Sequence, residues 1–433
     1  MSRTLASVPS FSPEEEFARG LDRRDPLAEF RERFHIPRGA DGKRQVYFAG
    51  NSLGLQPISV KALVEQELQD WAEKGVAGHF EAATPWYDYH RHLTDPLALI
   101  AGARPSEVVA MNSLTVNLHL MMISFYRPTQ QRHRILMEDC AFPSDTYAVK
   151  SQIAFHGFEP AGSLLVAKPR PEEDTLRTED ILSLLDEKGE EIALVLLGGV
   201  NYFTGQAFDL RSITEAAHRH GCLVGFDLAH AIGNVPLSLH DWGVDFAVWC
   251  SYKYLNAGPG AVAGCFIHER HGNDAALPRF SGWWGNDPAT RFRMHLLPDF
   301  EASAGAEGWQ LSNPPILSMA PLRASLELFQ EAGMKALREK SVLLTGYLEY
   351  LLRQIPGGAY RIITPADSAQ RGCQLSVGTK VGSRALLQAL QAQGIVADFR
   401  EPDVLRFAPV PLYSRFAEVW RLGQALHQSA TSS

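Results

Sequence analysis

Apolar and polar residues alternate in a regular order through the middle of the chain, between Arg134 and Leu255. Short continuous apolar runs, typical of strands buried on both faces of a sheet, are each followed by a segment with helical spacing. The apolar runs are RILME, IALVLLG, CLVGFDL and DFAVWCS, and the helical segments include DTYAVKSQIAF and DLRSITEAAHRHG. This order predicts βαβ units and a mostly parallel sheet with helices on both faces. Residues 261–268 are expected to add one further strand.

The pattern changes near Pro314, where one long helical segment is predicted over about residues 318–353. The chain is therefore expected to form an α/β protein, with a seven-stranded type of sheet in a large domain (55–320) and a smaller α+β domain (321–433). Residues 1–54 are expected to pack with the small domain. The remaining predicted elements are a helix over 58–74 with Leu63, Leu68 and Trp71 among its apolar positions, strands over 360–363, 373–377 and 395–399, and helices over 383–393 and 414–428.

Composition excludes several classes of function. The 433 residues are 45% hydrophobic and 21% charged, which is typical of a soluble globular enzyme. The net charge of -8 argues against nucleic acid as a partner, because no basic stripe would neutralise phosphates.

The chain also lacks the patterns of a secreted or membrane protein. Its start has an acidic run and no apolar core, so no signal peptide is expected. The most apolar long segment, Leu114–Tyr126, is too short and too polar at Asn117 and His119 to span a bilayer. Five cysteines without a CxxC pair indicate reduced, mostly buried thiols. We therefore expect a cytoplasmic protein with no membrane partner.

Two reactive side chains follow neighbouring predicted strands. Asp227 ends the run CLVGFDL, and Lys253 lies just past DFAVWCS. In open parallel sheets, ligands bind outside the carboxyl ends of the strands, so both groups should face one crevice. A buried carboxylate stabilises a protonated pyridine nitrogen, and a lysine amine holds an aldehyde as a Schiff base. A single Asp or Lys at a strand end is common, but the ordered set DLAH then SYKYLNAGPG predicts a pyridoxal 5'-phosphate (PLP) site.

Further segments fit the same cofactor, each with a plainer structural alternative. Residues 112–115 open a predicted helix, whose free amides and positive dipole end suit a phosphate, although Asn and Ser also serve as ordinary caps. In FPSD (142–145) the aromatic ring either stacks on a pyridine ring or belongs to the core, and the Ser or Asp is expected to cap the next helix. His230 and Tyr252 either bind the cofactor or pack structurally.

Other chemistries lack their patterns. His268–His271 reads HERH and not HExxH, and no metal site is expected. Gly258–Gly260 lacks the GxGxxG spacing and precedes a strand, which argues against a nicotinamide cofactor. There is no GxSxG elbow.

With these residues in view, the chain resembles the kynureninases, which are PLP-dependent enzymes of fold type I. The resemblance runs nearly end to end, through GNSLGLQP, NSLTVNLHLMM, FPSD, TGQAFDL, GFDLAHAIGNVPLSLHDWGVDF, CSYKYLNAGPG, GWWG, SNPPIL, KSVLLTGYLEYL and RFAPVPLY. It implies hydrolysis of the Cβ–Cγ bond of L-kynurenine or 3-hydroxy-L-kynurenine to an anthranilate and L-alanine, in tryptophan catabolism or NAD biosynthesis. It also implies PLP as cofactor, a small amino acid as substrate, and a homodimer with its sites at the subunit interface.

The resemblance assigns roles to individual residues. Lys253 is similar to the Schiff-base lysine and proton carrier, Asp227 to the partner of the pyridine nitrogen, and Tyr252 to a phosphate-side group and acid/base helper. The other implied cofactor-binding residues are Leu114, Thr115, Phe142, Pro143, Ser144, Asp145 and His230, with Trp283 and Asn313 supplied by the neighbouring subunit. The implied substrate-binding residues are His79, Ser312, Asn313 and Arg406, the last as a bidentate clamp for the α-carboxylate.

Two positions depart from the resemblance, and two alternatives stay open. Gly198 stands where relatives often carry Ser or Thr near the cofactor, and Trp284 stands where Phe is expected. The first alternative is a related PLP enzyme, an aminotransferase or a cysteine desulfurase; a desulfurase needs a mobile cysteine, for which Cys373 is the one cysteine outside the sheet pattern. The second is a non-catalytic PLP-binding regulator, against which the chain shows no basic arm.

Overall fold

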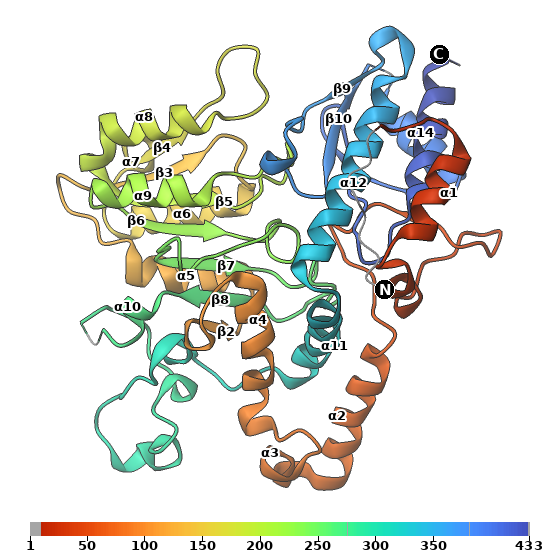
Figure 1. Cartoon of the computed structure of the whole chain (residues 1–433). Helices are drawn as coiled ribbons and strands as arrows, with labels where there is room; N and C mark the ends of the chain where they lie inside the picture. Colours follow the sequence, from red (N-terminus) through yellow and green to blue (C-terminus); the bar gives the residue numbers. More distant parts are fainter. Residues whose placement is uncertain (1–9, 275, 381, 432–433) are drawn as a thin grey trace.

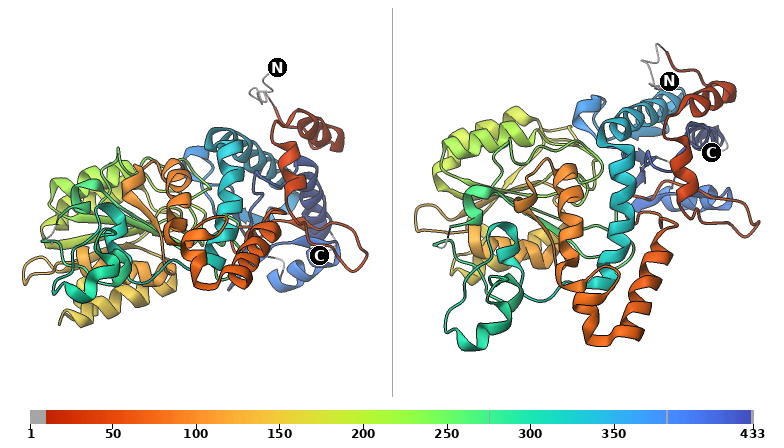
Figure 2. Two further views of the ribbon diagram at one scale, coloured as in Figure 1. Left: turned by 90° about the horizontal axis from the view of Figure 1, so that it is seen from below. Right: turned by 60° about the horizontal axis from the view of Figure 1, so that its bottom comes forward.

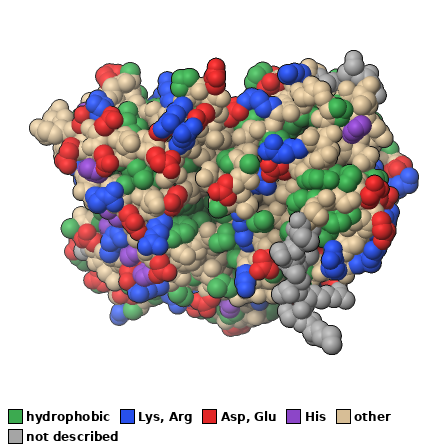
Figure 3. All heavy atoms as spheres, turned by 45° about the horizontal axis from the view of Figure 1, so that its top comes forward, with side chains coloured by type: hydrophobic (Ala, Val, Ile, Leu, Met, Phe, Trp, Pro, Cys, Tyr) green, Lys and Arg blue, Asp and Glu red, His purple; other side chains and the backbone are tan. Residues whose placement is uncertain are grey.

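The computed structural model describes residues 10–274, 276–380 and 382–431. Figure 1 shows two units side by side: a larger one built around the central sheet, and a smaller one that carries both ends of the chain. Within the described ranges, no helix is both long and apolar enough to cross a bilayer. On the face drawn in Figure 3, acidic and basic side chains are interspersed.

The central sheet has seven strands in the order β2-β8-β7-β6-β5-β3-β4. Every neighbouring pair is parallel except the two pairs made by β8, which runs antiparallel to β2 and β7. The predicted mostly parallel sheet is therefore confirmed. The strands are β2 (Val108–Ala110), β3 (Arg134–Glu138), β4 (Leu164–Ala167), β5 (Ile192–Gly198), β6 (Leu223–Asp227), β7 (Phe246–Trp249) and β8 (Gly264–Ile267).

Helices cover both faces of this sheet, which explains its continuous apolar runs. In β5, Val195 and Leu197 pack into one core, and Leu194 and Leu196 pack into a second core on the opposite face. The first core includes residues of α4, α8, α9 and α11 (Ile316–Ala332), and the second includes residues of α5 and α6. These helices and the shorter α7 and α10 are α4 (Thr94–Ala101), α5 (Leu114–Phe125), α6 (Pro143–Phe155), α7 (Pro160–Ser163), α8 (Thr178–Lys188), α9 (Leu210–Arg219) and α10 (Glu269–Gly272).

Two helices, not one, occupy the segment predicted as a single long helix. They are α11 (Ile316–Ala332) and α12 (Met334–Arg353), which run along the boundary between the two units (Figures 1 and 2). Gly333 separates them with a φ of 73°, a left-handed conformation that glycine adopts without steric cost. The periodicity of apolar residues continues across this glycine, so the sequence pattern alone did not reveal the break.

The smaller unit is built on a four-stranded antiparallel sheet in the order β12-β13-β10-β9, with a separate parallel pair of β1 and β11. The strand predicted over 395–399 is wrong as one element, because it divides into β11 and β12, which join different sheets. The elements are α1 (Glu15–Arg24), β1 (Val46–Tyr47), β9 (Tyr360–Ile362), β10 (Leu375–Thr379), α13 (Ser383–Ala392), β11 (Ile395–Val396), β12 (Asp398–Arg400), β13 (Val404–Phe407) and α14 (Phe416–Thr431).

The chain start packs against this smaller unit. A third hydrophobic core combines residues from 18–48 with residues from 344–426. A buried ion pair joins Lys340 of α12 to Asp25, with Nζ and Oδ2 2.7 Å apart, and Arg31 pairs with Glu418 of α14 at 2.6 Å. These contacts favour the proposed grouping of residues 1–54 with the small domain; residues 1–9 of that segment lie outside the described residues.

Helix α2 (Val60–Lys74) and the short α3 (Gly78–Glu81) project beside α11 at the edge of the molecule (Figure 1). Two of the apolar positions predicted for α2 are exposed: Leu68 by 44% and Trp71 by 61%. Val60 is buried and Leu63 and Val64 pack against the core, so one side of α2 faces the core while Leu68 and Trp71 lie off it.

Candidate functional site

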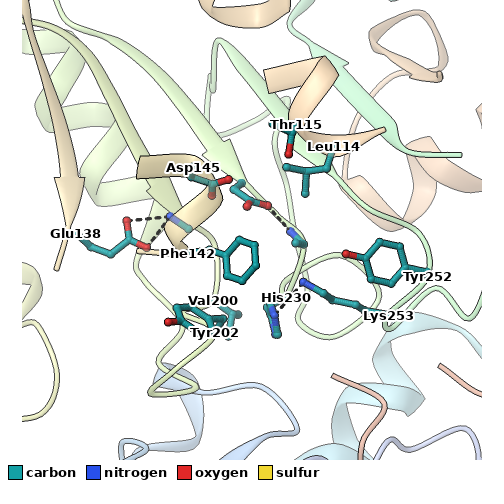
Figure 4. A pocket seen from close by; sticks show the side chains of 13 residues that line it. Leu114, Thr115, Glu138, Phe142, Asp145, Val200, Tyr202, His230, Tyr252 and Lys253 are labelled. Carbon is teal, nitrogen blue, oxygen red and sulfur yellow. Dashed lines mark hydrogen bonds between the residues drawn. The ribbon is translucent and has the colours of Figure 1, made fainter. Parts of the chain in front are cut away.

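Four parallel strands, β3, β5, β6 and β7, end at one edge of the central sheet, and the chemistry of the site lies there. Glu138, Gly198 and Asp227 are the last residues of the first three strands, and Lys253 follows β7 by four residues. Helices α5 and α6 begin at the same edge. Figure 4 shows the pocket that results, lined by Leu114, Thr115, Glu138, Phe142, Asp145, Gly198, Val200, Tyr202, Asp227, Ala229, His230, Tyr252 and Lys253.

Lys253 points into this pocket beside His230. The Nζ of Lys253 lies 3.1 Å from Nε2 of His230 and 5.7 Å from the ring centroids of Phe142 and Tyr252. Burial and the nearby charge of Lys253 hold the pKa of His230 well below its usual range, so its imidazole is neutral. A neutral ring can accept the hydrogen bond from the lysine through Nε2. Its buried Nδ1 has no hydrogen-bond partner among the described residues.

Two carboxyl groups share the opposite wall of the pocket. Asp227 is 9% exposed, and its Oδ1 accepts a hydrogen bond of 2.7 Å from the amide of Ala229. Asp145, in the first turn of α6, is 6% exposed. Burial, the charge of Asp227 and a hydrogen bond to Asp227 raise the pKa of Asp145 well above its usual range. The charge of Asp227 and the burial of Asp145 therefore both favour the protonated form of Asp145.

A third carboxyl group, Glu138, lines the pocket and was missed in the sequence. It is 4% exposed, and both of its oxygens accept from the amide of Gly198 at 3.2 Å. A Cβ at position 198 would lie 2.9 Å from Oε1 of Glu138, so the carboxyl group fills the space that a side chain there would take. The signal was available, because Glu138 ends the apolar run RILME as Asp227 ends CLVGFDL. Val200, Tyr202 and Ala229 were also missed.

The first turns of α5 and α6 meet at the far end of the pocket. Ser113 is the N-cap of α5 but its side chain caps nothing, and Asn112 bonds to Asn117 instead. The amides of the first turn of α5 therefore remain available to an anion. Thr115 Oγ1 lies 3.3 Å from Ser144 Oγ of α6.

The expectation that Ser144 or Asp145 caps α6 is wrong. The N-cap of that helix is Phe142, with no side-chain capping bond, and Pro143 is its first residue. A proline suits that position because its missing N–H would have had no partner inside the helix. Phe142 stays 44% exposed beside the pocket, with its ring edge-on to Tyr202 at 5.3 Å.

The segment GNSLGLQP supports the loop that carries the lysine. The amide of Gly54 donates to the carbonyl of Tyr252 at 2.8 Å. A Cβ at position 54 would lie 2.2 Å from the carbonyl oxygen of Lys253, so no larger residue fits without moving that loop. A segment far away in sequence thus fixes the backbone on which the reactive amine is placed.

Arg406, the expected carboxylate clamp, lies beside the pocket but does not line it. It sits in β13, is 1% exposed, and donates to the carbonyl of Tyr202 at 2.7 Å. Its Nη2 also bonds to Asp398 Oδ2 at 2.5 Å and to Ser52 Oγ at 3.2 Å. In this conformation the guanidinium is engaged by another carboxylate, which a substrate carboxylate would have to displace.

Pro143 and Ser144, in the first turn of α6, also lie outside the pocket lining, as do four other predicted residues. His79 packs edge-on to Trp86 at 5.4 Å, and Trp283 packs edge-on to Trp284 at 4.7 Å. Ser312 and Asn313 are exposed on the loop that leads into α11. One chain therefore does not bring these four side chains to its own Lys253, and their roles stay predictions.

One cluster of possible metal ligands lies away from the pocket. Glu107, His240 and His268 place one ligand atom each within 4.8 Å of one another. The buried carboxylate of Glu107 already accepts from His240 Nδ1 at 2.9 Å and from the amides of Arg104 and Glu269 at 2.8 Å. The carboxylate of Glu107 is therefore already hydrogen-bonded within the protein, and the cluster connects the start of β2 to the segment after β8.

Comparison with known proteins agrees with the geometry. The sequence model of the kynureninase C-terminal domain matches residues 337–426. The chain is 58% identical to a kynureninase of Koribacter versatilis, over 96% of this chain and 97% of that protein. It is also 58% identical to a kynureninase of Myxococcus xanthus, over 97% of this chain and 98% of that protein.

Solved structures share the fold at low identity. A mutant of C-DES with glycine covalently linked to its PLP cofactor superposes with a TM-score of 0.75 at 20% identity, covering 88% of this chain and 96% of the other. The cysteine desulfurase CsdA of Escherichia coli gives a TM-score of 0.75 at 17% identity, covering 94% and 98%. The fold is thus that of the fold-type I PLP enzymes. Nearly complete coverage at 58% identity shows the narrower relationship: the chain belongs to the kynureninase family.

Proposed function

We propose that this protein is a PLP-dependent hydrolase that cleaves the Cβ–Cγ bond of L-kynurenine, or of its 3-hydroxy form, to an anthranilate and L-alanine. The observation that carries the proposal is the meeting of Lys253, His230 and Asp227 in one pocket of a chain that matches kynureninases over almost its full length. In such enzymes the cofactor performs the difficult bond chemistry, and the protein orients the reacting groups and sets their protonation.

The residues of the pocket fit PLP. The free amides at the start of α5 suit its phosphate, and the half-exposed ring of Phe142 offers a surface for stacking. Two buried polar atoms beside the pocket, His230 Nδ1 and Asp145 Oδ1, have no partner in the described part of the chain. Buried polar atoms are nearly always paired in native proteins, so these two indicate a polar ligand.

When bound, PLP would supply an electron sink for negative charge on the substrate carbons. Lys253 is the amine for covalent attachment and, once released, the base that moves the proton at the substrate Cα. His230 is neutral and accepts from Lys253, which keeps Nζ aimed into the pocket. Asp227, as a buried carboxylate, stabilises positive charge on a ring nitrogen.

Tyr252 acts as a donor. Burial is the main cause that raises the pKa of Tyr252 far above its usual value, and the neighbouring Cys250 adds to the effect. A phenol in that environment stays protonated across the physiological range, so it can donate a hydrogen bond or a proton but does not begin the reaction as a base.

The rival cysteine desulfurase activity is disfavoured by the environment of Cys373. Its side chain is fully buried, and its backbone amide is bonded to Asn234 at 2.9 Å. Burial raises the pKa of the Cys373 thiol to about 12, which leaves almost no thiolate at neutral pH. A persulfide-forming cysteine needs the opposite properties, exposure and a reactive thiolate.

A homodimer completes the proposal, because the chain exposes a surface with many large apolar side chains, on α2, α3 and the segment around Phe292, next to the predicted site residue Trp283. Phe80 of α3 lies 6.1 Å from Phe292 between ring centroids, and Phe292 lies 6.5 Å from Trp283. The exposed apolar members of this surface are Leu68, Trp71, Val76, Phe80, Phe292, Met294, Leu296, Leu297 and Leu317. Monomeric proteins rarely expose so many large apolar side chains together, and a second copy of this chain is the occupant we propose.

Product analysis tests the activity. Purified protein with PLP and L-kynurenine should release anthranilate and alanine in equal amounts without any added keto acid. A requirement for a keto acid would indicate transamination, and sulfide release from cysteine would indicate desulfuration. Parallel assays with 3-hydroxy-L-kynurenine would determine the preferred substrate.

Mixing two inactive variants tests the shared site. If Asn313 acts on the neighbouring subunit's Lys253, random mixing of Lys253→Ala and Asn313→Ala protomers restores about one quarter of the sites, because half of the dimers are mixed and each has one intact site. Activity that stays at the level of the separate variants would contradict a shared site.

A further inference from the structure

The buried glutamate at the end of β3 has no assigned part in the chemistry described above. Glu138 lines the same pocket as Asp227 and Lys253, and Figure 4 shows its carboxyl group turned to the amide of Gly198. We propose that Glu138 is a further residue of the cofactor site, and that its carboxyl group tunes the charge which Asp227 presents to a bound pyridine ring. The inference deepens the proposed function, because it requires that PLP binds in this pocket.

The surroundings of Glu138 make its charge adjustable. No lysine, arginine or histidine of the described ranges forms an ion pair with it. The charged and titratable groups that act on it are carboxyl groups and a thiol: Asp227 of β6, Asp145 of α6 and Cys140 of the following loop. Its polar partners are the amide of Gly198 and the side chain of Asn201. A second negative charge at this place would be repelled by the first.

These surroundings bring the ionisation of Glu138 into the working range of an enzyme. Burial, followed by the charge of Asp227, raises the pKa of Glu138 to about 7, although hydrogen bonds from the backbone and Asn201 work in the other direction. The carboxyl group is therefore neutral below about pH 7 and negative above it. Ionisation adds a second negative charge that interacts with Asp227, and this charge favours the protonated form of a bound ring.

If Glu138 served only to hold the amide of Gly198, a neutral hydrogen-bond acceptor would be sufficient. A glutamine amide oxygen accepts from the Gly198 amide as well as a carboxyl oxygen does, and the two side chains have nearly the same shape. Glu138→Gln therefore keeps the contact and removes only the ability to ionise. Glu191→Gln is the matched control, because Glu191 lies at the other end of β5, 43% exposed and paired with Arg134.

The experiment compares the PLP-loaded wild type, E138Q and E191Q by visible absorbance of the bound cofactor from about pH 5 to about pH 9, a range of about two units on either side of neutrality. The wild type and E191Q should show a spectral transition near pH 7 that E138Q lacks. The next transition, at higher pH, should move down by about half a unit or more in E138Q, because a negative charge that stabilises the protonated cofactor is gone. Thermal melting of the three apoproteins should differ little.

Identical titrations of E138Q and the wild type would overturn the inference, as would a loss of apoprotein stability with unchanged spectra. Gly198→Ala is a second variant, because its Cβ would displace the carboxyl group of Glu138 without removing it. The transition near pH 7 should shift in this variant. A transition that does not move would also count against the role of Glu138. If the wild type itself bound no PLP, the proposed function would fail. Bound PLP with spectra indifferent to E138Q would overturn only the role of Glu138.

Discussion

Arg406→Ala is the perturbation that best separates substrate binding from cofactor binding. The guanidinium of Arg406 lies outside the lining of the pocket proposed to bind PLP, and is held by Asp398 and the carbonyl of Tyr202. If this group binds the substrate α-carboxylate, its removal costs the charge-assisted hydrogen bonds to that carboxylate, about 1.5–3 kcal/mol. This corresponds to a loss of about 10- to 150-fold in kcat/KM, mostly through KM. The affinity for PLP should change less than about threefold.

The assay measures steady-state kinetics with L-kynurenine together with PLP content per subunit. The variant also leaves Asp398 buried without its main partner, but Arg400 Nη1 remains 3.2 Å from that carboxylate and limits the loss of stability. The double variant Arg406→Ala/Asp398→Asn removes the orphaned charge and should show the same kinetic defect. Arg384→Ala, on an exposed pair of the same unit, is the control and should be neutral. An unchanged KM, or loss of PLP with Arg406, would refute the assignment.

Three further predictions concern the support of the site and the stability of the fold. Gly54→Ala should lower the PLP content of purified protein, measured by absorbance, because its Cβ collides with the carbonyl of Lys253; full PLP content would contradict the support role. Lys340→Met should lower the free energy of unfolding in urea by about 3–5 kcal/mol, because it leaves Asp25 buried and unpaired, and adding Asp25→Leu should recover much of the loss. Burial works to raise the pKa of Glu307, but the nearby imidazole of His90 and hydrogen bonds from Arg91 lower it to about 2. This depressed pKa contributes about 3 kcal/mol of stability above pH 4.5, and the contribution is lost as the pH falls toward 2. Glu307→Gln should therefore be less stable than the wild type at pH 7 and nearly equal to it near pH 2.

The larger part of the fold could be predicted from apolar periodicity, and its exceptions have physical causes. The runs RILME, IALVLLG, CLVGFDL and DFAVWCS became β3, β5, β6 and β7 because a strand buried on both faces must be apolar throughout. The break at Gly333 was missed because the apolar positions stay in helical phase across it. Leu68 and Trp71 look like core residues in the sequence, because an apolar pattern does not show whether a side chain lies in the core or on the surface.

Site residues at the ends of strands could be predicted from the sequence, whereas residues whose position depends on tertiary packing were missed. Asp227 and Lys253 could be found because parallel strands bring their carboxyl ends to one edge. Glu138 obeys the same rule, but a glutamate at a strand end usually faces solvent, and only the fold shows that it is buried over Gly198. The engagement of Arg406 by Asp398 depends on the register of β12 against β13, which the sequence does not reveal.

The attachment of PLP to one lysine tests the account most directly. Reduction of the PLP-loaded protein with borohydride would fix the cofactor to its amine, and trypsin does not cut after a modified lysine. The account predicts the label on a single peptide from His220 to Arg270, which carries Lys253 together with Asp227 and His230. A label on any other lysine, or none on protein saturated with PLP, would contradict it.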